Sequence, residues 1–333
     1  MSNPEWAIGA GERVNLGTIV LGRGDIIAFA TEFDAQPFHL DESAAETTLL
    51  GGLAASGWHT CTAVMSLLQR AASERGLALE PAGAEEILWL RPVRPDDALT
   101  ATLVWGPRGC HACSERVGSF PIAIETINQG GDPVMRCRMD CLVRQAHVDA
   151  PLRVGDCPIR RARPARASRR AGDHGIKFFE DVAPGDEIDL GDYAFDRERI
   201  RSFRATYDGA PIAVSSRNEA LTASVWHVTA AWMHCIVRYY AHHALQLSQR
   251  GRPVPILGPA AGVKHLRWHR PVGPGETISY RAWAERKIEI ASHEDWGLLV
   301  VGAEGVNANG DPVVSFYPQM LLERAARARR KVG

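Results

Sequence analysis

The chain has 333 residues, of which 45% are apolar and 23% are charged, and its formal net charge is −1. These values are typical of a globular protein of about two domains, and they argue against disordered or collagen-like chains and against a global attraction to nucleic acid. No apolar run reaches the roughly 18 residues that cross a bilayer, and the N-terminal segment lacks the features of a signal peptide. The odd number of cysteines, seven, suits reduced thiols, so we expect a cytoplasmic protein without membrane or nucleic-acid partners.

The predicted elements begin, in chain order, with a short strand over 14–20 and a helical turn at GRGDI (22–26). Apolar residues at spacings of three and four then predict a long helix with one broad buried face. That stripe comprises Ala54, Trp58, Cys61, Met65, Leu68 and Ala72. Four strand-like runs follow, ILWLRPV, LTATLVW, IAIETINQ and VMRCRMDCLV. A long helix followed by an antiparallel meander predicts an α+β domain whose curved sheet wraps the helix.

The second half of the chain repeats the first. Five collinear blocks pair 14–17 with 188–191, 29–41 with 203–215, 54–59 with 222–227, 89–97 with 268–276 and 127–134 with 306–313. Between the second and third blocks the offset falls from 174 to 168 residues, so the second copy is six residues shorter there. We therefore expect two copies of one domain, at 1–147 and 175–333, joined by an exposed Arg- and Pro-rich linker at 148–174.

The motif DAQPFH (34–39) stands just before the first long helix. Asp34 and His39 can meet across a turn whose geometry the intervening proline restricts. Such a pair can hold one water, which is the minimal equipment for adding water to an activated double bond or removing it. The alternative interpretation is a helix-capping Asp and a surface His. The second copy keeps the acid as Asp208 but has Ala213 in place of the His, so only the first copy has the complete pair.

Together with ASGWHT (55–60) and the RPVRPDD turn (91–97), this motif resembles the MaoC-like, or (R)-specific, enoyl-CoA hydratases and dehydratases, which have the hotdog fold. The resemblance covers both halves and so implies a double hotdog, with two central helices and their sheets joined into one surface. The family's catalytic pair corresponds to Asp34 and His39. Its glycine at the start of the central helix corresponds to Gly57, whose N–H would hold the thioester oxygen at a helix N-terminus.

The resemblance implies hydration of a 2-enoyl thioester to a 3-hydroxyacyl thioester, or the reverse dehydration, in the N-terminal half. No metal or redox cofactor is needed, because coenzyme A or a phosphopantetheine carrier is part of the substrate. The expected partner is thus an acyl-CoA or acyl-carrier thioester, and a homodimer of such chains is compatible with the family. The candidate substrate-binding residues are Gln36, Ser56 and Trp58 near the pair, with Lys264, His265 and Arg267 of the second half as candidates for the CoA phosphates.

The same resemblance predicts one deep pocket, lined by Asp34, His39 and Gly57 and reached between the halves. Gly51 and Gly52 would give flexibility to a covering lid, while the pseudo-equivalent site of the second half would be shallow or filled. Two other functions suit a hotdog chain. One is an acyl-CoA thioesterase, which does not need the Asp/His pair, and the other is a non-catalytic acyl-thioester binding protein, in which His39 is incidental.

Two further patterns are interpreted as structural. Cys110, Cys113, Cys137 and Cys141 could suggest zinc, but a hairpin turn at 130–131 pairs Cys137 with Ile124 and leaves Cys113 roughly 20 Å further along the strand. His59 and His227 align between the two copies, which favours packing over catalysis because the second copy lacks the complete pair.

Overall fold

The computed structural model describes residues 9–109, 117–145, 175–209, 221–291 and 293–332, so the expected linker at 148–174 lies outside it. The strands of the first half are β1 (Arg13–Val20), β2 (Leu77–Trp89), β3 (Ala98–Trp105), β4 (Gly118–Ile127) and β5 (Pro133–Gln145). Those of the second half are β6 (Glu187–Phe195), β7 (Leu257–Trp268), β8 (Glu276–Glu289), β9 (Trp296–Val306) and β10 (Pro312–Glu323).

The helices follow the same repeat. The first half contains α1 (Arg23–Phe33), α2 (Pro37–Leu40), α3 (Glu42–Glu46) and α4 (Gly57–Glu74). The second half contains the 3-10 helix η1 (Phe179–Asp181), α5 (Arg197–Tyr207), α6 (Val225–Gln249) and α7 (Ala325–Val332). The helical turn expected at 22–26 is a three-turn helix, α1, and α5 is its counterpart at DRERI (196–200) and beyond. None of the helices within the described ranges is long and apolar enough to cross a membrane.

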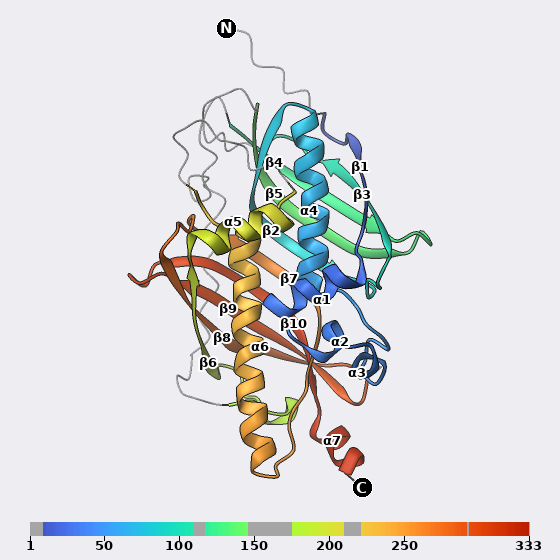
Figure 1. Ribbon diagram of the computed structural model, residues 1–333, viewed down its shortest axis with the longest axis vertical. Helices are drawn as coiled ribbons and strands as arrows, with labels where there is room; N and C mark the ends of the chain where they lie inside the picture. The colour runs from blue at the N-terminus through green and yellow to red at the C-terminus, as the bar shows by residue number, and fades with distance from the viewer. Residues whose placement is uncertain (1–8, 110–116, 146–174, 210–220, 292, 333) are drawn as a thin grey trace.

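The ten strands of the described ranges form one antiparallel sheet in the order β1-β3-β4-β5-β2-β7-β10-β9-β8-β6. The two halves of this order are mirror images, which is the arrangement that a duplicated domain gives. The helices α4 and α6 lie across one face of the sheet, each over the strands of its own half (Figure 1). Both begin with the same cap, in which Ser56 or Ser224 accepts a hydrogen bond from the N–H two residues later, at 3.3 Å. The predicted α+β architecture is confirmed.

The strand order differs in one respect from the expected meander. In the first half only β3, β4 and β5 form a meander, whereas β2 lies on the far side of β5; in the second half β8, β9 and β10 form a meander and β7 lies beyond β10. The loop after β2 passes the N-terminal end of α4 on its way to β3. There the Val93 carbonyl accepts a hydrogen bond from the Ala55 N–H (2.8 Å), and the Asp96 N–H then donates to the Leu21 carbonyl (2.8 Å) beside β1. The edge of β2 that faces away from β5 pairs with the second half.

The seam between the halves is the antiparallel pair β2 and β7, which runs from Gly83 opposite Arg267 to Leu88 opposite Gly262. The two glycines are equivalent positions of the repeat and stand at opposite ends of the seam. A Cβ on Gly262 would lie 2.5 Å from the Ile87 carbonyl oxygen, and one on Gly83 would lie 2.9 Å from that of Leu266. The close approach of the two strands therefore requires glycine at both positions.

Candidate active site

Asp34 and His39 meet at the end of α1. Asp34 is the residue at which α1 ends, and its N–H donates to the Ala30 carbonyl (2.8 Å). Pro37 then starts the short helix α2, which turns the chain back so that His39 Nε2 lies 3.4 Å from Asp34 Oδ2. Asp34 is 3% exposed and His39 is 5% exposed, so the pair is closed off from solvent. The structure brings together the two residues that the sequence singled out, and their catalytic role stays a prediction.

The tautomer of His39 follows from its other ring nitrogen. His39 Nδ1 lies 2.7 Å from the Ala54 carbonyl oxygen. Because a carbonyl can only accept, Nδ1 carries the hydrogen, and Nε2 of the neutral ring presents a lone pair to Asp34. Two acceptors that face each other in a buried site need a shared proton or a water that donates to both. The pair can therefore share one proton or bind one water.

Two neighbouring side chains orient the Asp34 carboxylate. Gln36 Nε2 donates to Asp34 Oδ1 (2.9 Å), and Ser56 Oγ donates to Asp34 Oδ2 (2.7 Å). Ser56 is also the cap of α4, so it fixes the carboxylate relative to the start of the central helix. Gln36 and Ser56, the expected substrate-binding residues, both contact Asp34, and a part in substrate binding stays a prediction.

Gly57 is the first residue of α4, where a backbone N–H has no partner within the helix. A Cβ at this position would lie 2.5 Å from Cε2 of Trp89, so the indole occupies the space that the glycine leaves. Trp58, the third expected binding residue, is buried in edge-on contact with Trp89 (5.3 Å between ring centroids) and with Phe316 of the second half (5.9 Å). Trp58 thus belongs to the core that joins the halves.

The expected phosphate-binding residues lie at the seam. Lys264 Nζ is 3.2 Å from Glu86 Oε1, and His265 Nδ1 is 3.2 Å from Glu85 Oε1. Arg267 donates to the Ala84 carbonyl (3.1 Å) and lies 3.5 Å from Glu85 Oε2. These contacts join β7 to β2 and do not reach the Asp34–His39 pair, so a part in phosphate binding stays a prediction.

In the second half an arginine contacts the aligned aspartate, a feature that the sequence reasoning missed. Arg204 Nε lies 3.4 Å from Asp208 Oδ2, and Arg204 Nη1 donates to the Thr222 carbonyl (3.0 Å). Thr222 aligns with Ala54, so Arg204 makes both contacts that His39 makes in the first half. Burial raises the pKa of Asp208 to about 6, against the opposing effects of a hydrogen bond from Ser224 and the charge of Arg204. Ala213 lies outside the described residues.

The signal for Arg204 was present in the sequence. At the offset of 174, Arg204 aligns with Ala30, so the second copy gains a long cation one helical turn before its aspartate.

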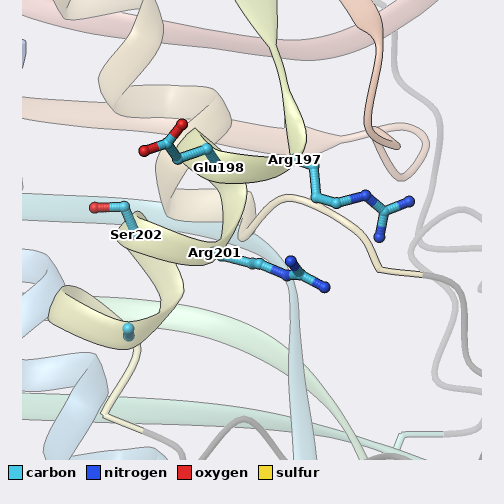
Figure 2. A pocket seen from close by; sticks show the side chains of 5 residues that line it. Arg197, Glu198, Arg201 and Ser202 are labelled. Carbon is cyan, nitrogen blue, oxygen red and sulfur yellow. The ribbon is translucent and has the colours of Figure 1, made fainter.

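Two hollows lie away from the Asp34–His39 pair. One is a depression on α5 lined by Arg197, Glu198, Arg201, Ser202 and Ala205, where the two arginines project to the same side of the helix (Figure 2). The other is an apolar cavity between α6 and the sheet, lined by Ile236, Leu299 and Met320 among others. A deep pocket at the pair stays a prediction.

The repeated histidines form part of a two-fold aromatic cluster between the halves. His59 stacks on Phe29 (4.8 Å), and His227 stacks on Phe203 (4.4 Å), the equivalent residue of the second copy. Burial lowers the pKa of His59 to about 4 and that of His227 to about 3, so both rings are neutral near pH 7. These contacts agree with the packing function expected for His59 and His227.

The predicted hairpin register of the cysteine strands is confirmed, with Cys137 opposite Ile124 and Cys141 opposite Phe120. Both thiols are buried, and burial raises the pKa of Cys137 to about 12. Within the described ranges, which omit Cys110 and Cys113, no three His, Cys, Asp or Glu residues are grouped as metal ligands would be.

Structural comparison gives the fold. A MaoC domain protein from Chloroflexus aurantiacus J-10-fl matches with a TM-score of 0.71 at 14% identity, over 97% of this chain and 99% of that chain. A conserved hypothetical protein from Mycobacterium tuberculosis, described as having a double hotdog fold, matches with a TM-score of 0.67 at 13% identity, over 95% of this chain and 97% of that chain. These likenesses confirm the double hotdog fold.

Sequence comparison gives the family. The sequence model of the MaoC like domain matches residues 10–108, which include Asp34, His39 and Gly57. A MaoC-like dehydratase from Rhodospirillum rubrum is 34% identical over 44% of this chain and 96% of that chain, with a TM-score of 0.38. A search of curated proteins found no match. The chain belongs to the MaoC-like dehydratase family, with the matched domain in its N-terminal half and the double hotdog fold over its length.

Proposed function

We propose that this protein hydrates a 2-enoyl thioester to a 3-hydroxyacyl thioester, or catalyses the reverse dehydration, at a single site in its N-terminal half. The observation that carries the proposal is the buried Asp34–His39 pair. His39 Nε2 lies 3.4 Å from Asp34 Oδ2, and His39 Nδ1 is hydrogen-bonded to the Ala54 carbonyl. Membership of the MaoC-like dehydratases supports dehydratase chemistry in general, and the pair supplies the groups that such chemistry needs.

The proposed reaction uses one water that donates hydrogen bonds to both Asp34 Oδ2 and His39 Nε2 from beside the pair. In hydration, the pair takes a proton from the water as its oxygen attacks the β-carbon, and it returns a proton to the α-carbon. The net change adds OH to the β-carbon and H to the α-carbon, and no other reactant is consumed. Ser56 and Gln36 hold the carboxylate in place through both of its oxygens, so the acid and base are preorganised.

The thioester oxygen would be held at the start of α4. Negative charge develops on this oxygen when water adds to the β-carbon, and the Gly57 N–H and the positive end of the α4 dipole would stabilise it there. Coenzyme A or a phosphopantetheine carrier enters as part of the substrate, so the acyl-thioester is also the proposed partner. Because Arg204 takes the place of the histidine in the second half, we propose one catalytic site per chain.

One assay separates this function from the two alternatives. Crotonyl-CoA is incubated with the protein while the absorbance of the conjugated enoyl thioester and the release of free thiol are followed together. Hydration lowers the absorbance without releasing thiol, a thioesterase releases thiol, and a non-catalytic binding protein does neither. Thiol release at the rate of absorbance loss would contradict the proposal, as would the absence of both changes with crotonyl-CoA and longer 2-enoyl-CoA substrates.

A further inference from the structure

The segment before α4 is held by an arginine from a distant loop. Arg94, in the loop that follows β2, donates through Nη1 to the carbonyls of Gly52 (2.7 Å) and Leu53 (3.1 Å) and through Nη2 to that of Leu50. Glu42 closes the other side of the segment, because its Oε1 accepts from the Leu53 N–H (3.2 Å). Three carbonyls in four residues thus share one guanidinium, the side chain whose rigid fork best suits several acceptors.

This segment carries the carbonyl that orients His39. Ala54 follows directly after Leu53, its N–H donates to the Phe38 carbonyl (3.1 Å), and its own carbonyl accepts from His39 Nδ1 (2.7 Å). Gly51 and Gly52 have φ values of +62° and +144°, a conformation that other residues rarely adopt. The N–H groups of the two glycines donate to the Thr48 and Ala45 carbonyls (both 3.2 Å), and Arg94 adds the contacts that tie the segment to the loop after β2.

The second half makes the same backbone contact of this loop without an arginine. Gly273 aligns with Arg94, and the segment before α6 is six residues shorter. The backbone contact of the loop is nevertheless repeated, because the Ala223 N–H donates to the Val272 carbonyl at 2.8 Å, as the Ala55 N–H does to that of Val93. The arginine therefore accompanies the histidine, and the half without the histidine folds the same loop without it.

We propose that Arg94 is a positioning residue for the Asp34–His39 site. It fixes residues 50–53, so that the Ala54 carbonyl holds the His39 ring with Nε2 directed at Asp34. The expected effect of Arg94 on kcat rests on the function proposed above, whereas its effect on the orientation of the His39 ring does not. The sequence suggested Gly51 and Gly52 as part of a flexible lid. We propose instead that the segment containing them holds the His39 ring in place.

The test compares Arg94→Gly, which installs the residue of the second half, with Arg94→Lys and with Arg91→Gly as a matched control. Arg91 lies in the same loop but contacts the Pro133 carbonyl (3.1 Å) and Asp132 (3.4 Å), away from residues 50–53. The Nδ1–H signal of His39 is followed by NMR in protein with ¹⁵N-labelled histidine and is identified by its loss in His39→Ala. We expect Arg94→Gly to lose or broaden this signal, and the lysine and control variants to retain it.

The kinetic arm uses the same proteins with crotonyl-CoA. We expect Arg94→Gly to lower kcat by about 10²-fold, the effect of misplacing a catalytic group by about 1 Å, with KM changed less than about 3-fold. The lysine ammonium still offers three hydrogen-bond donors, so Arg94→Lys should retain at least about a tenth of the wild-type kcat. A purely structural arginine would lower the thermal midpoint and leave both the signal and kcat unchanged.

The outcomes distinguish the two proposals. A folded Arg94→Gly protein that keeps the His39 signal overturns the positioning role. If the signal is lost but the wild-type protein hydrates no enoyl-CoA, the positioning role stands and the proposed function fails. If circular dichroism shows that Arg94→Gly is unfolded, Arg94→Met, which keeps the aliphatic stem, carries the same expectation and can overturn it in the same way.

Discussion

Arg204 in the second half makes the same pair of contacts that His39 makes in the first. His39 joins Asp34 (3.4 Å) to the Ala54 carbonyl (2.7 Å), and Arg204 joins Asp208 (3.4 Å) to the carbonyl of the aligned Thr222 (3.0 Å). Arg204 lies in α5, one helical turn before Asp208, whereas His39 lies in α2, after Asp34. A guanidinium stays protonated in proteins and cannot act as a general base. We therefore propose that the second half keeps these two contacts without acid–base chemistry.

The first prediction follows from this asymmetry. Asp208→Asn should leave the turnover of an enoyl-thioester within about 3-fold of wild type, because Arg204 cannot complete an acid–base pair, whereas Asp34→Asn should reduce it by about 10²-fold or more. Both variants are measured at saturating substrate, with circular dichroism to check folding. An equal loss in the two folded proteins would mean that the second half carries chemistry.

The second prediction concerns the space beside Gly57. Gly57→Ala places a Cβ 2.5 Å from the rigid indole of Trp89, which must shift. Overpacking of this kind costs about 1–3 kcal/mol of unfolding free energy, and the shift should also lower turnover. Combining Gly57→Ala with Trp89→Leu should cost less than the sum of the two single changes, because the clash is removed. Additive losses in urea unfolding would show that the two residues do not compete for this space.

The third prediction concerns acid stability. Burial lowers the pKa of His227 to about 3, below the unfolded value near 6.5. The stability it contributes is therefore fully present above about pH 6.5 and is lost as the pH falls, by about 1.4 kcal/mol per pH unit. His227→Phe can still stack on Phe203 but cannot ionise, so its stability should fall less steeply.

Urea unfolding at pH 7, 6 and 5 measures the difference between His227→Phe and wild type. The raised pKa of Asp208 acts in the opposite direction and is common to both proteins, so it cancels in the comparison. Curves that stay parallel between pH 7 and 5 would show that the neutral His227 ring does not limit acid stability.

The repeat made most of the fold predictable from the sequence. The strand and helix order, the cysteine register and the proximity of Asp34 and His39 all follow from local patterns or short turns. The position of β2 at the seam was not predictable, because the loop after β2 makes its hydrogen bonds to Ala55 and Leu21, which are distant in sequence. The local pattern also could not show that Lys264 and Arg267 pair with Glu86 and Glu85 across the seam. Side-chain partners of this kind are set by strand register between the two halves.

The most direct test of the central claim is the initial rate of crotonyl-CoA hydration by His39→Ala, measured as absorbance loss beside wild type. His39 Nε2 is the ring nitrogen that faces Asp34, and Ala54 holds the other, so alanine removes one acceptor of the proposed water. The account predicts a rate at least about 10²-fold lower in a protein with unchanged circular dichroism. A wild-type rate in the folded variant would show that the reaction does not use this histidine and would contradict the assigned site.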